Sequence, residues 1–347
     1  MAMRATTIHA PFDVRLSEVP DPVIEQPTDA VVRIVAGCIC GSDLWSYRGE
    51  NAITPGSRIG HELVGIVEQT GSDVRTVRPG DFVVVPFVAS DGTCPNCRAG
   101  YQSVCQNLVG IGGRTNDGGQ GEYARIPYAD GTLVATPEVP DDALVPSLLT
   151  LSDVMGTGWH AARAAGVRAG HTVVVVGDGA VGLCGVLAAA RMGAERVVAL
   201  SRHQPRQKIA REFGATHVIA ERGEAAEAAV LELTDGVGAD AVLECVGTDQ
   251  SFATAFAVAR AGATVGFVGI PHGVEVPIRT MFQRNVGLAG GVAPVRAYLP
   301  ELMTDVLAGA INPGLVFDEV RPLSEVAEGY RSMHERRAIK TLLRPGG

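Results

Sequence analysis

The stretch from Thr172 to Arg202 constrains the fold of this chain more than any other segment. It opens with four consecutive valines, 173–176, and a β-branched run of this kind is typical of a strand buried on both faces. A G-x-G-x-x-G motif follows at 177–182, then an alanine-rich helical segment to 191 and a second apolar strand over 197–200. The order strand, glycine turn, helix, strand within about 30 residues is the context in which this motif binds dinucleotides.

Each glycine of the motif has its own physical task. Gly177 permits the tight turn, Gly179 lets a pyrophosphate approach the backbone, and Gly182 lets helix and strand pack closely. The free N–H groups at the start of the helix, around Ala180 and Val181, favour an anion. We therefore predict a dinucleotide-binding site here, and the alternative is a glycine turn with a structural task alone.

The composition excludes several function classes. With 46 % hydrophobic and 19 % charged residues among 347, the chain resembles an ordinary globular protein of about two domains. A net charge of −9 without a basic cluster argues against binding to nucleic acid or to an anionic membrane surface. The first residues lack the apolar core of a signal peptide, and no apolar run is long enough to span a bilayer. We expect a cytoplasmic protein.

The secondary-structure pattern of the sequence changes along the chain. Residues 1 to about 88 consist of short apolar runs between Pro, Gly and Asp turns, which predicts an all-β, barrel-like domain without a convincing helix. From 141 to 168 the pattern is helical, and βαβ alternation then predicts a parallel sheet with helices on both faces. The expected strands are 172–176, 196–200, 217–219, 240–244, 263–269 and 287–289, and the expected helices are 180–192, 205–213, 224–233 and 250–260. Helices at 295–307 and 323–336, with strands near 317 and over 338–343, complete the chain.

Two separated motifs suggest a catalytic metal site. The first is a Cys-Gly-Ser-Asp box that contains Cys40 and Asp43, and the second contains His61. A catalytic zinc takes three protein ligands and keeps one position open, so a third ligand must come from farther along the chain. Asp153 is the candidate, and it lies where the predicted β-domain passes into the dinucleotide-binding domain. Asp43 is placed to orient His61. Taken singly, Cys40 could be a core cysteine and His61 an ordinary polar residue.

A second group of metal-type residues is local. Cys94, Cys97 and Cys105 fall within twelve residues, and an odd total of seven cysteines does not suit a disulfide framework. The alternative is three free thiols with no metal, or with a loosely held one.

The residues after the second strand bear on the choice of cofactor. An NAD-binding protein would carry Asp or Glu about 20 residues past the glycines. Ser201 stands there instead, followed by Arg202 and Arg206, and we expect no carboxylate to repel a 2′-phosphate. A hydroxyl beside a guanidinium suits that phosphate, which favours NADP. The alternative is that Arg202 is an ordinary exposed residue at a strand end.

Taken together, these motifs resemble the zinc-dependent medium-chain alcohol dehydrogenases. The matches are the Cys-Gly-Ser-Asp box, Gly60-His61-Glu62, the glycine motif and Ile339-Lys340-Thr341-Leu342-Leu343, spread over nearly the whole chain. The resemblance implies a GroES-like catalytic domain, 1–152 with 291–347, into which a Rossmann domain, 153–290, is inserted. It also implies a small-molecule alcohol or carbonyl substrate and a homodimer or homotetramer.

The resemblance further implies roles for individual residues. Cys40, His61 and Asp153 would be the catalytic-zinc ligands, and Glu62 a carboxylate that can enter the metal's shell during turnover. Ser42 falls where the family takes the proton of the alcohol, and Trp45 stands where many relatives carry a histidine. An acidic third ligand such as Asp153 occurs in secondary-alcohol and polyol types. Trp45, Phe87 and Trp159 are candidates for the substrate cleft, with core packing favoured for Trp159.

The second cysteine group resembles the family's structural-zinc lobe, with Asp91 in the place of the first cysteine beside Cys94, Cys97 and Cys105. Ser201 and Arg202 resemble the Gly-Ser-Arg of NADP-dependent secondary-alcohol dehydrogenases, and Thr157 is a further cofactor-binding candidate. The expected function is a zinc- and NADP(H)-dependent alcohol dehydrogenase. Two alternatives remain, a zinc-free quinone or enone reductase of the same fold and a non-enzymatic cofactor-sensing protein.

Overall fold

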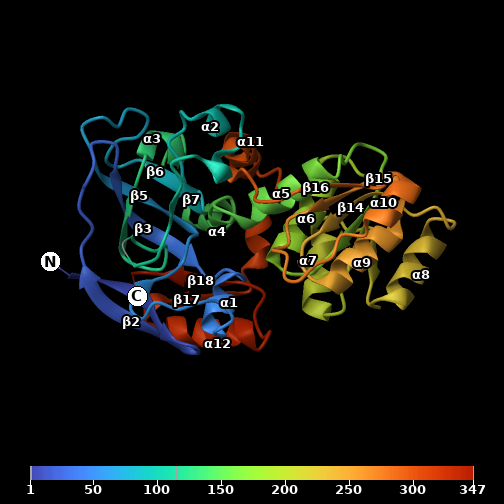
Figure 1. The fold of residues 1–347 in the computed structure, drawn as a ribbon. Coiled ribbons are helices and arrows are strands. Elements are labelled where there is room, and N and C mark those ends of the chain that lie inside the picture. Colours follow the sequence, from blue (N-terminus) through green and yellow to red (C-terminus); the bar gives the residue numbers. More distant parts are fainter. Residues whose placement is uncertain (1, 115, 347) are drawn as a thin grey trace. The chain divides into compact units, whose positions relative to one another are not determined.

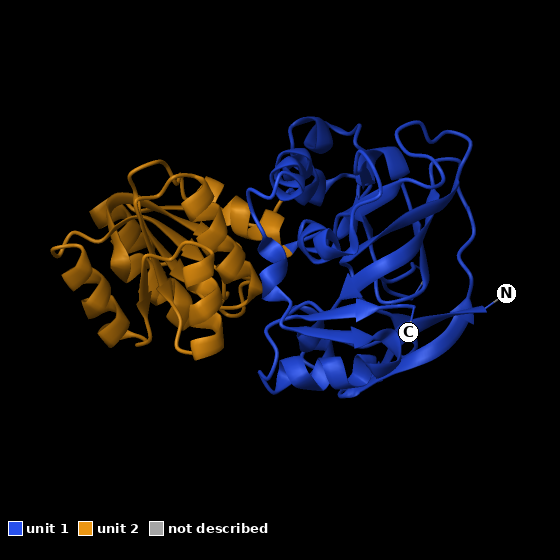
Figure 2. Ribbon diagram, turned by 180° about the vertical axis from the view of Figure 1, so that it is seen from behind, with its two compact units in different colours: residues 1–153, 294–347 blue, residues 154–293 orange. Residues whose placement is uncertain are grey.

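A computed structural model describes residues 2–114 and 116–346, and it divides the chain into two compact units (Figure 2). Unit 1 comprises residues 1–153 and 294–347, and unit 2 comprises residues 154–293. The chain therefore leaves unit 1 after Asp153 and returns to it at Pro294. Within the described ranges, no helix is both long enough and apolar enough to cross a membrane.

Unit 2 is built on a six-stranded sheet in the order β13-β12-β11-β14-β15-β16, in which every neighbouring pair is parallel. This confirms the predicted doubly wound sheet. Figure 1 labels β14, β15 and β16 of this sheet. Helix α5 packs against α6, and α8 packs against α9. The strands are β11 (Thr172–Val176), β12 (Arg196–Leu200), β13 (His217–Ile219), β14 (Ala239–Glu244), β15 (Ala259–Phe267) and β16 (Gly287–Gly290). The helices are α5 (Val154–Ala164), α6 (Ala180–Arg191), α7 (Gln204–Glu212), α8 (Glu224–Leu233), α9 (Asp249–Val258) and α10 (Ile278–Arg284).

Strand β11 occupies the position that matters for ligand binding. It lies between β12 and β14, so the connections leave it in opposite directions across the sheet. The crevice at the carboxyl ends of the strands at such a switch point is the usual ligand site of an open parallel sheet. The glycine motif begins directly at this end of β11.

Unit 1 is dominated by antiparallel strands. A seven-stranded sheet has the order β10-β6-β5-β3-β18-β17, with β9 also paired to β3, and a three-stranded sheet has the order β2-β1-β4. The final strand β18 runs antiparallel to β3, with Leu342 opposite Cys38, so the end of the chain completes the N-terminal sheet. The strands are β1 (Ala2–Ala10), β2 (Asp13–Pro20), β3 (Ala30–Cys38), β4 (Ser57–Arg58), β5 (Leu63–Thr70), β6 (Phe82–Val85), β7 (Val88–Ala89), β8 (Val109–Gly110), β9 (Tyr123–Ile126), β10 (Val134–Ala135), β17 (Glu319–Pro322) and β18 (Thr341–Arg344).

The helices of unit 1 correct two predictions. The expectation of no helix before residue 88 is wrong at α1, which is too short to show a helical period and buries only Leu44 and Tyr47. The helical stretch predicted over 141–168 is divided between α4 and α5. The N–H groups of Leu151, Ser152 and Asp153 bond three residues back, which tightens the chain out of the α-helix. The unit contains α1 (Asp43–Tyr47), α2 (Pro95–Arg98), α3 (Ala129–Thr132), α4 (Val145–Thr150), α11 (Val295–Leu307) and α12 (Val326–His334).

One buried ion pair ties the C-terminal strand to the N-terminal part of unit 1. Lys340 immediately precedes β18, and its Nζ donates to Glu62 Oε1 at 2.6 Å and to the Ile39 carbonyl at 3.3 Å. The side chains of Lys340 and Glu62 are 1 % and 0 % exposed. Removing one partner of such a pair leaves an uncompensated buried charge, which costs about 3–5 kcal/mol. The pairing therefore specifies where the end of the chain must lie.

The glycine motif generates a stability prediction. A Cβ added at Gly182 would lie 2.0 Å from the Gly177 carbonyl oxygen, whereas one added at Gly179 meets no atom within 4 Å. Gly182→Ala should therefore lower the free energy of unfolding by about 2–3 kcal/mol, and Gly179→Ala should change it by less than about 1 kcal/mol. Thermal unfolding of the two variants beside the wild type checks this. Equal losses of stability would contradict the assignment of close helix–strand packing to Gly182 alone.

Candidate metal centres and cofactor site

Four of the predicted catalytic-site residues converge within unit 1. Cys40, His61, Glu62 and Asp153 each offer a ligand atom, and all four atoms lie within 4.8 Å of one another. Cys40 follows β3, His61 and Glu62 precede β5, and Asp153 lies in the turn that ends α4. Cys40 Sγ lies 3.9 Å from Asp153 Oδ2, and His61 Nε2 lies 3.4 Å from the same oxygen. The fold therefore assembles residues that are more than a hundred positions apart.

A hydrogen-bonded network fixes the orientation of this group. His61 Nδ1 faces Asp43 Oδ1 at 3.4 Å, which leaves Nε2 directed at Asp153. Asp43 Oδ2 accepts from the Cys40 backbone N–H at 2.9 Å and from Gln120 Nε2 at 3.2 Å. Gln120 also bonds the hydroxyl of Tyr330, which is fully buried. Sequence patterns gave no signal for Gln120 or Tyr330, because they are isolated polar residues far from the motifs.

The charges of the group suit a cation. Burial raises the pKa of the Cys40 thiol, and the negative charge of Glu62 adds to this effect. For His61, burial acts to lower the pKa, but the charges of Asp43 and Cys40 outweigh it and raise the pKa well above the usual value. Glu62 Oε2 is buried and has no hydrogen-bond partner among the residues described. Thiolate, imidazole and carboxylate are zinc's common ligands, so the donor set fits that ion.

The other residues expected near the catalytic group lie on or beside α1, after β6 and on α5. Ser42 is half-buried at the start of α1, and its hydroxyl makes no capping hydrogen bond. Trp45 is half-buried on the same helix. Phe87 is also half-buried, and its N–H donates to the Ser152 carbonyl at 3.0 Å, beside Asp153. Trp159 is only 4 % exposed within α5 of unit 2, as core packing requires.

The second predicted metal group also converges. Asp91, Cys94, Cys97 and Cys105 offer ligand atoms that all lie within 4.8 Å of one another. All three sulfurs belong to buried residues, and Cys94 Sγ lies 3.8 Å from Cys105 Sγ. The chain's cysteines are all free thiols, so no disulfide accounts for this cluster.

Backbone N–H groups surround the sulfurs of this lobe. Those of Cys97 and Gln106 donate to Cys94 Sγ at 3.5 Å, and those of Asp91 and Asn107 donate to Cys105 Sγ at 3.4 Å and 3.3 Å. Hydrogen bonds of this kind stabilise a thiolate, and the donation from Gln106 is the largest cause of the lowered pKa of Cys94. Burial instead raises the pKa of Cys97 to about 12, so the lobe favours an anionic sulfur at Cys94 but not at Cys97. The N–H groups around Cys94 and Cys105 are compatible with sulfurs that bind a cation.

Asp91 already has hydrogen-bond partners. Its Oδ1 accepts from the backbone N–H groups of Thr93 and Cys94 at 2.8 Å and 2.9 Å, and its Oδ2 accepts from Asn107 Nδ2 at 2.7 Å. Burial alone would raise the pKa of Asp91, but these bonds together lower it far below the usual value. The carboxylate is therefore held in its charged form beside the three sulfurs, and it serves as a turn residue at the same time.

The predicted cofactor residues lie at the carboxyl ends of β11 and β12. Gly177 has a φ of +118°, which only glycine adopts readily, and Gly179 is exposed at the start of α6 with open space above it. The first helical residues, Ala180 and Val181, present the free N–H groups of α6 beside it. Thr157 is half-buried in α5, the helix that packs on α6.

The contacts at the carboxyl ends of β11 and β12 contradict one expectation. The prediction that no carboxylate is present is wrong, because Asp178 of the glycine motif contacts both Ser201 and Arg206. Its Oδ2 accepts from Ser201 Oγ at 2.9 Å, and its Oδ1 pairs with Arg206 NH1 at 2.9 Å. Arg202 is exposed and donates from Nε to His203 at 3.3 Å. The sequence prediction considered only residues that follow the glycines. Asp178 lies within the motif, and it reaches Ser201 because β11 and β12 are adjacent strands.

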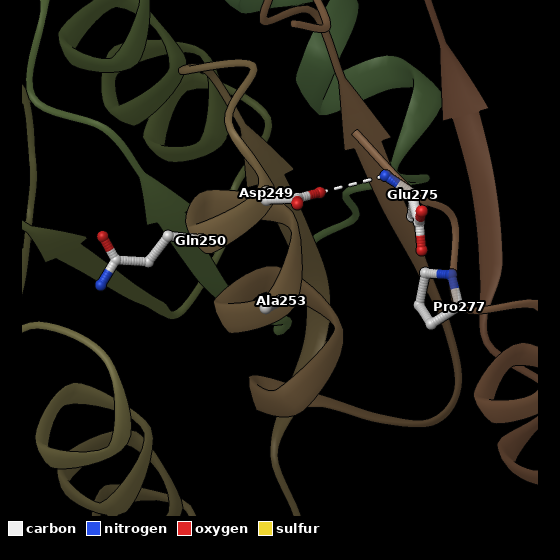
Figure 3. A pocket seen from close by; sticks show the side chains of 5 residues that line it. All are labelled: Asp249, Gln250, Ala253, Glu275 and Pro277. Atoms are coloured by element: carbon white, nitrogen blue, oxygen red, sulfur yellow. Dashed lines mark hydrogen bonds between the residues drawn. The ribbon is translucent and has the colours of Figure 1, made fainter. Parts of the chain in front are cut away.

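None of the predicted site residues lines the surface pocket of unit 2. It is lined by Asp249, Gln250, Ala253, Glu275 and Pro277 (Figure 3). Asp249 Oδ1 accepts the backbone N–H of Glu275 at 3.0 Å across it. Its lining combines two carboxylates with no thiol or imidazole, so it does not resemble either metal group.

Comparison with known proteins places this chain in a family. Residues 26–138 match the alcohol dehydrogenase GroES-like domain, and residues 180–308 match the zinc-binding dehydrogenase domain. Zinc-type alcohol dehydrogenase B of Aspergillus flavus is 34 % identical over 99 % of this chain and 82 % of its own length.

Solved structures agree in fold. The alcohol dehydrogenase TADH from Thermus sp. ATN1 superposes with a TM-score of 0.92 at 31 % identity, covering 99 % of both chains. A protein described as a zinc-binding dehydrogenase from Sinorhizobium meliloti 1021, solved bound to NADP, has a TM-score of 0.84 at 27 % identity and covers 99 % of this chain and 100 % of its own. With its GroES-like unit, its inserted Rossmann unit and these relatives over its full length, the chain belongs to the zinc-dependent medium-chain alcohol dehydrogenase family.

Proposed function

We propose that this chain is a zinc-dependent oxidoreductase that transfers a hydride between NADP(H) and an alcohol and its aldehyde or ketone. One observation carries the proposal: Cys40, His61, Glu62 and Asp153 converge within 4.8 Å in a chain whose central parallel strand ends in a dinucleotide motif. Cys40, His61 and Asp153 together disfavour a zinc-free quinone or enone reductase of this fold. The same ligand set with Ser42, two residues after Cys40, disfavours a non-enzymatic cofactor-sensing protein.

The catalytic zinc would be held by Cys40, His61 and Asp153. It supplies Lewis acidity toward the oxygen of the substrate, while NADP(H) supplies or takes up the hydride. Asp43 faces Nδ1 of His61 and leaves Nε2 directed toward Asp153, so that Nε2 would be available to the metal. Lys340 neutralises Glu62 at Oε1, which leaves Oε2 available inside the group.

Ser42 is our candidate for the group that moves the proton. Its half-buried hydroxyl follows Cys40 by two residues and makes no capping bond. A hydroxyl can accept the proton of the alcohol and pass on its own, whereas Trp45 can only donate through its indole N–H. The proton would leave Ser42 through the cofactor ribose or water, without a histidine at position 45.

We assign the lobe of Asp91, Cys94, Cys97 and Cys105 to a structural zinc. The four ligand atoms converge, and the N–H groups around the sulfurs favour thiolates. A closed set of four protein ligands leaves no position for substrate, which separates this site in function from the catalytic one.

NADP(H) is the proposed cofactor, with the 2′-phosphate received by Ser201, Arg202 and Arg206. The two arginines carry more charge than the single carboxylate of Asp178 removes. The Sinorhizobium meliloti relative solved bound to NADP supports this choice by similarity. Gly177, Gly179, Ala180, Val181 and Gly182 would hold the pyrophosphate, and Thr157 would contribute from α5.

The substrate would be a small secondary alcohol or polyol, since Asp153 is an acidic third ligand. We further propose a cytoplasmic homodimer or homotetramer. The net charge of −9 supports the exclusion of nucleic acid as a partner.

Removal of one catalytic ligand tests the metal assignment. Cys40→Ala and Asp153→Ala should abolish turnover and lower the zinc content from about two ions per chain to about one, because an incomplete ligand set releases the ion. Binding of NADPH, followed by its fluorescence, should persist because the cofactor residues lie in unit 2. Cys184→Ala is the matched control, since Cys184 is a buried cysteine of unit 2 that belongs to neither metal group, and it should retain both zinc ions and activity. Near-normal activity in either ligand variant would refute the assignment.

Cofactor choice is tested at the exposed arginine. Arg202→Ala should weaken NADP by about tenfold and leave NAD nearly unchanged, because a hydrogen bond to a charged group contributes roughly 1.5–3 kcal/mol and Arg206 retains part of the charge. Steady-state kinetics with both cofactors at a fixed alcohol concentration measures this. Arg211→Ala removes the same charge from the last turn of α7 and should affect neither cofactor. A wild-type preference for NAD, or equal weakening of both cofactors by Arg202→Ala, would show that NADP is not the preferred cofactor.

A further inference from the structure

The glycine motif contains a carboxylate whose contacts the motif does not explain. Asp178 lies between the first two glycines, and a dinucleotide site needs no acidic side chain at that position. Nevertheless each oxygen of its carboxylate has a partner, since Oδ1 pairs with Arg206 and Oδ2 accepts from Ser201, both at 2.9 Å. Arg206 NH1 also donates to the Asp178 carbonyl oxygen at 3.3 Å.

These contacts join two neighbouring strand ends. β11 and β12 are parallel, and Val176 stands opposite Leu200. Ser201 directly follows Leu200, and Asp178 follows Val176 by two residues, so both lie at the same edge of the sheet. The adenosine ribose of a bound dinucleotide lies at this edge, beyond the glycine turn and beside the end of the second strand. The side chains of Asp178 and Arg206 are 13 % and 16 % exposed, so the pair is partly shielded from water.

We propose that Asp178 is a specificity-determining residue that weakens the hold on the 2′-phosphate and so reduces the preference for NADP(H) over NAD(H). The inference rests on the proposed dehydrogenase function. It adds to the same cofactor site an acidic residue that opposes the groups proposed to bind the phosphate. Ser201 and Arg206 are two of the groups that would bind the phosphate. Both already contact a carboxylate, which is negatively charged like the phosphate.

Two physical effects of Asp178 shift the cofactor preference in the same direction, toward NAD(H). A 2′-phosphate is repelled by the Asp178 carboxylate and competes with it for Arg206, which lowers affinity for NADP(H). A 2′-hydroxyl can instead donate to that carboxylate, as it does to the acidic residue of NAD-binding proteins, which raises affinity for NAD(H). Removal of the negative charge should therefore shift the preference toward NADP(H), whichever effect is larger.

Asp178→Asn is the most direct variant, because it removes the charge and keeps both the size and an oxygen that can accept from Ser201. We expect the ratio of kcat/KM with NADP to kcat/KM with NAD to rise about tenfold, and the ratio of dissociation constants for NADPH and NADH, measured by fluorescence titration, to shift equally. Asp178→Ser should shift both ratios in the same direction if the asparagine variant folds poorly.

Asp240→Asn is the matched control. Asp240 pairs with Arg260 at 2.7 Å and accepts the Thr172 N–H at 2.8 Å, which places it at the beginning of β11 rather than at its end. The variant loses the same charge within the same unit, and its cofactor ratio should equal that of the wild type.

The outcomes separate this proposal from the proposed function. An unchanged or lower NADP-to-NAD ratio in both Asp178 variants would overturn the role of Asp178, even if the enzyme oxidises alcohols with NADP. A wild type that binds both nucleotides but shows no turnover would contradict the dehydrogenase, while the titrations would still decide the role of Asp178. A wild type that binds neither nucleotide would contradict both.

Discussion

The buried pair of Lys340 and Glu62 is the interaction on which the arrangement of unit 1 depends. Lys340 Nζ lies 2.6 Å from Glu62 Oε1, and neither side chain is exposed by more than 1 %. A cation buried this deeply must have its partner, so strand β18 has one energetically acceptable position beside β3. The same contact restrains Glu62 next to Cys40 and His61. The closure of the fold and the construction of the metal group are therefore parts of one electrostatic arrangement.

The two metal groups are organised differently. The lobe of residues 91–105 is local, and the sulfurs of Cys94 and Cys105 accept hydrogen bonds from N–H groups of its own turns. The proposed catalytic group is assembled from residues after β3, before β5 and after α4, and the Asp43–Gln120–Tyr330 hydrogen bonds lie beside it. A local site can be stable within its loop, whereas a long-range site requires the complete unit 1.

The sequence predicted those parts of the protein that local patterns determine. The valine run and the glycine turn predicted β11 and its ligand edge, and the cysteine spacing predicted the lobe. The contacts of Asp178 could not be predicted in this way, because they depend on the pairing of β11 with β12 rather than on distance along the chain. Helix α1 was too short for a period to emerge, and Tyr330 and Gln120 meet only through tertiary packing. Lys340 is part of a C-terminal motif in the sequence. Its pairing with Glu62 could not be predicted, because it depends on the pairing of β18 with β3.

The most direct measurement of the central claim is anomalous X-ray diffraction from crystals of the purified protein at energies just above and below the zinc absorption edge. We predict two zinc peaks per chain, one within about 2.0–2.3 Å of Cys40, His61 and Asp153 and one among Asp91, Cys94, Cys97 and Cys105. A difference map with zinc in the lobe and none between Cys40, His61 and Asp153, from protein that is fully active, would contradict the account.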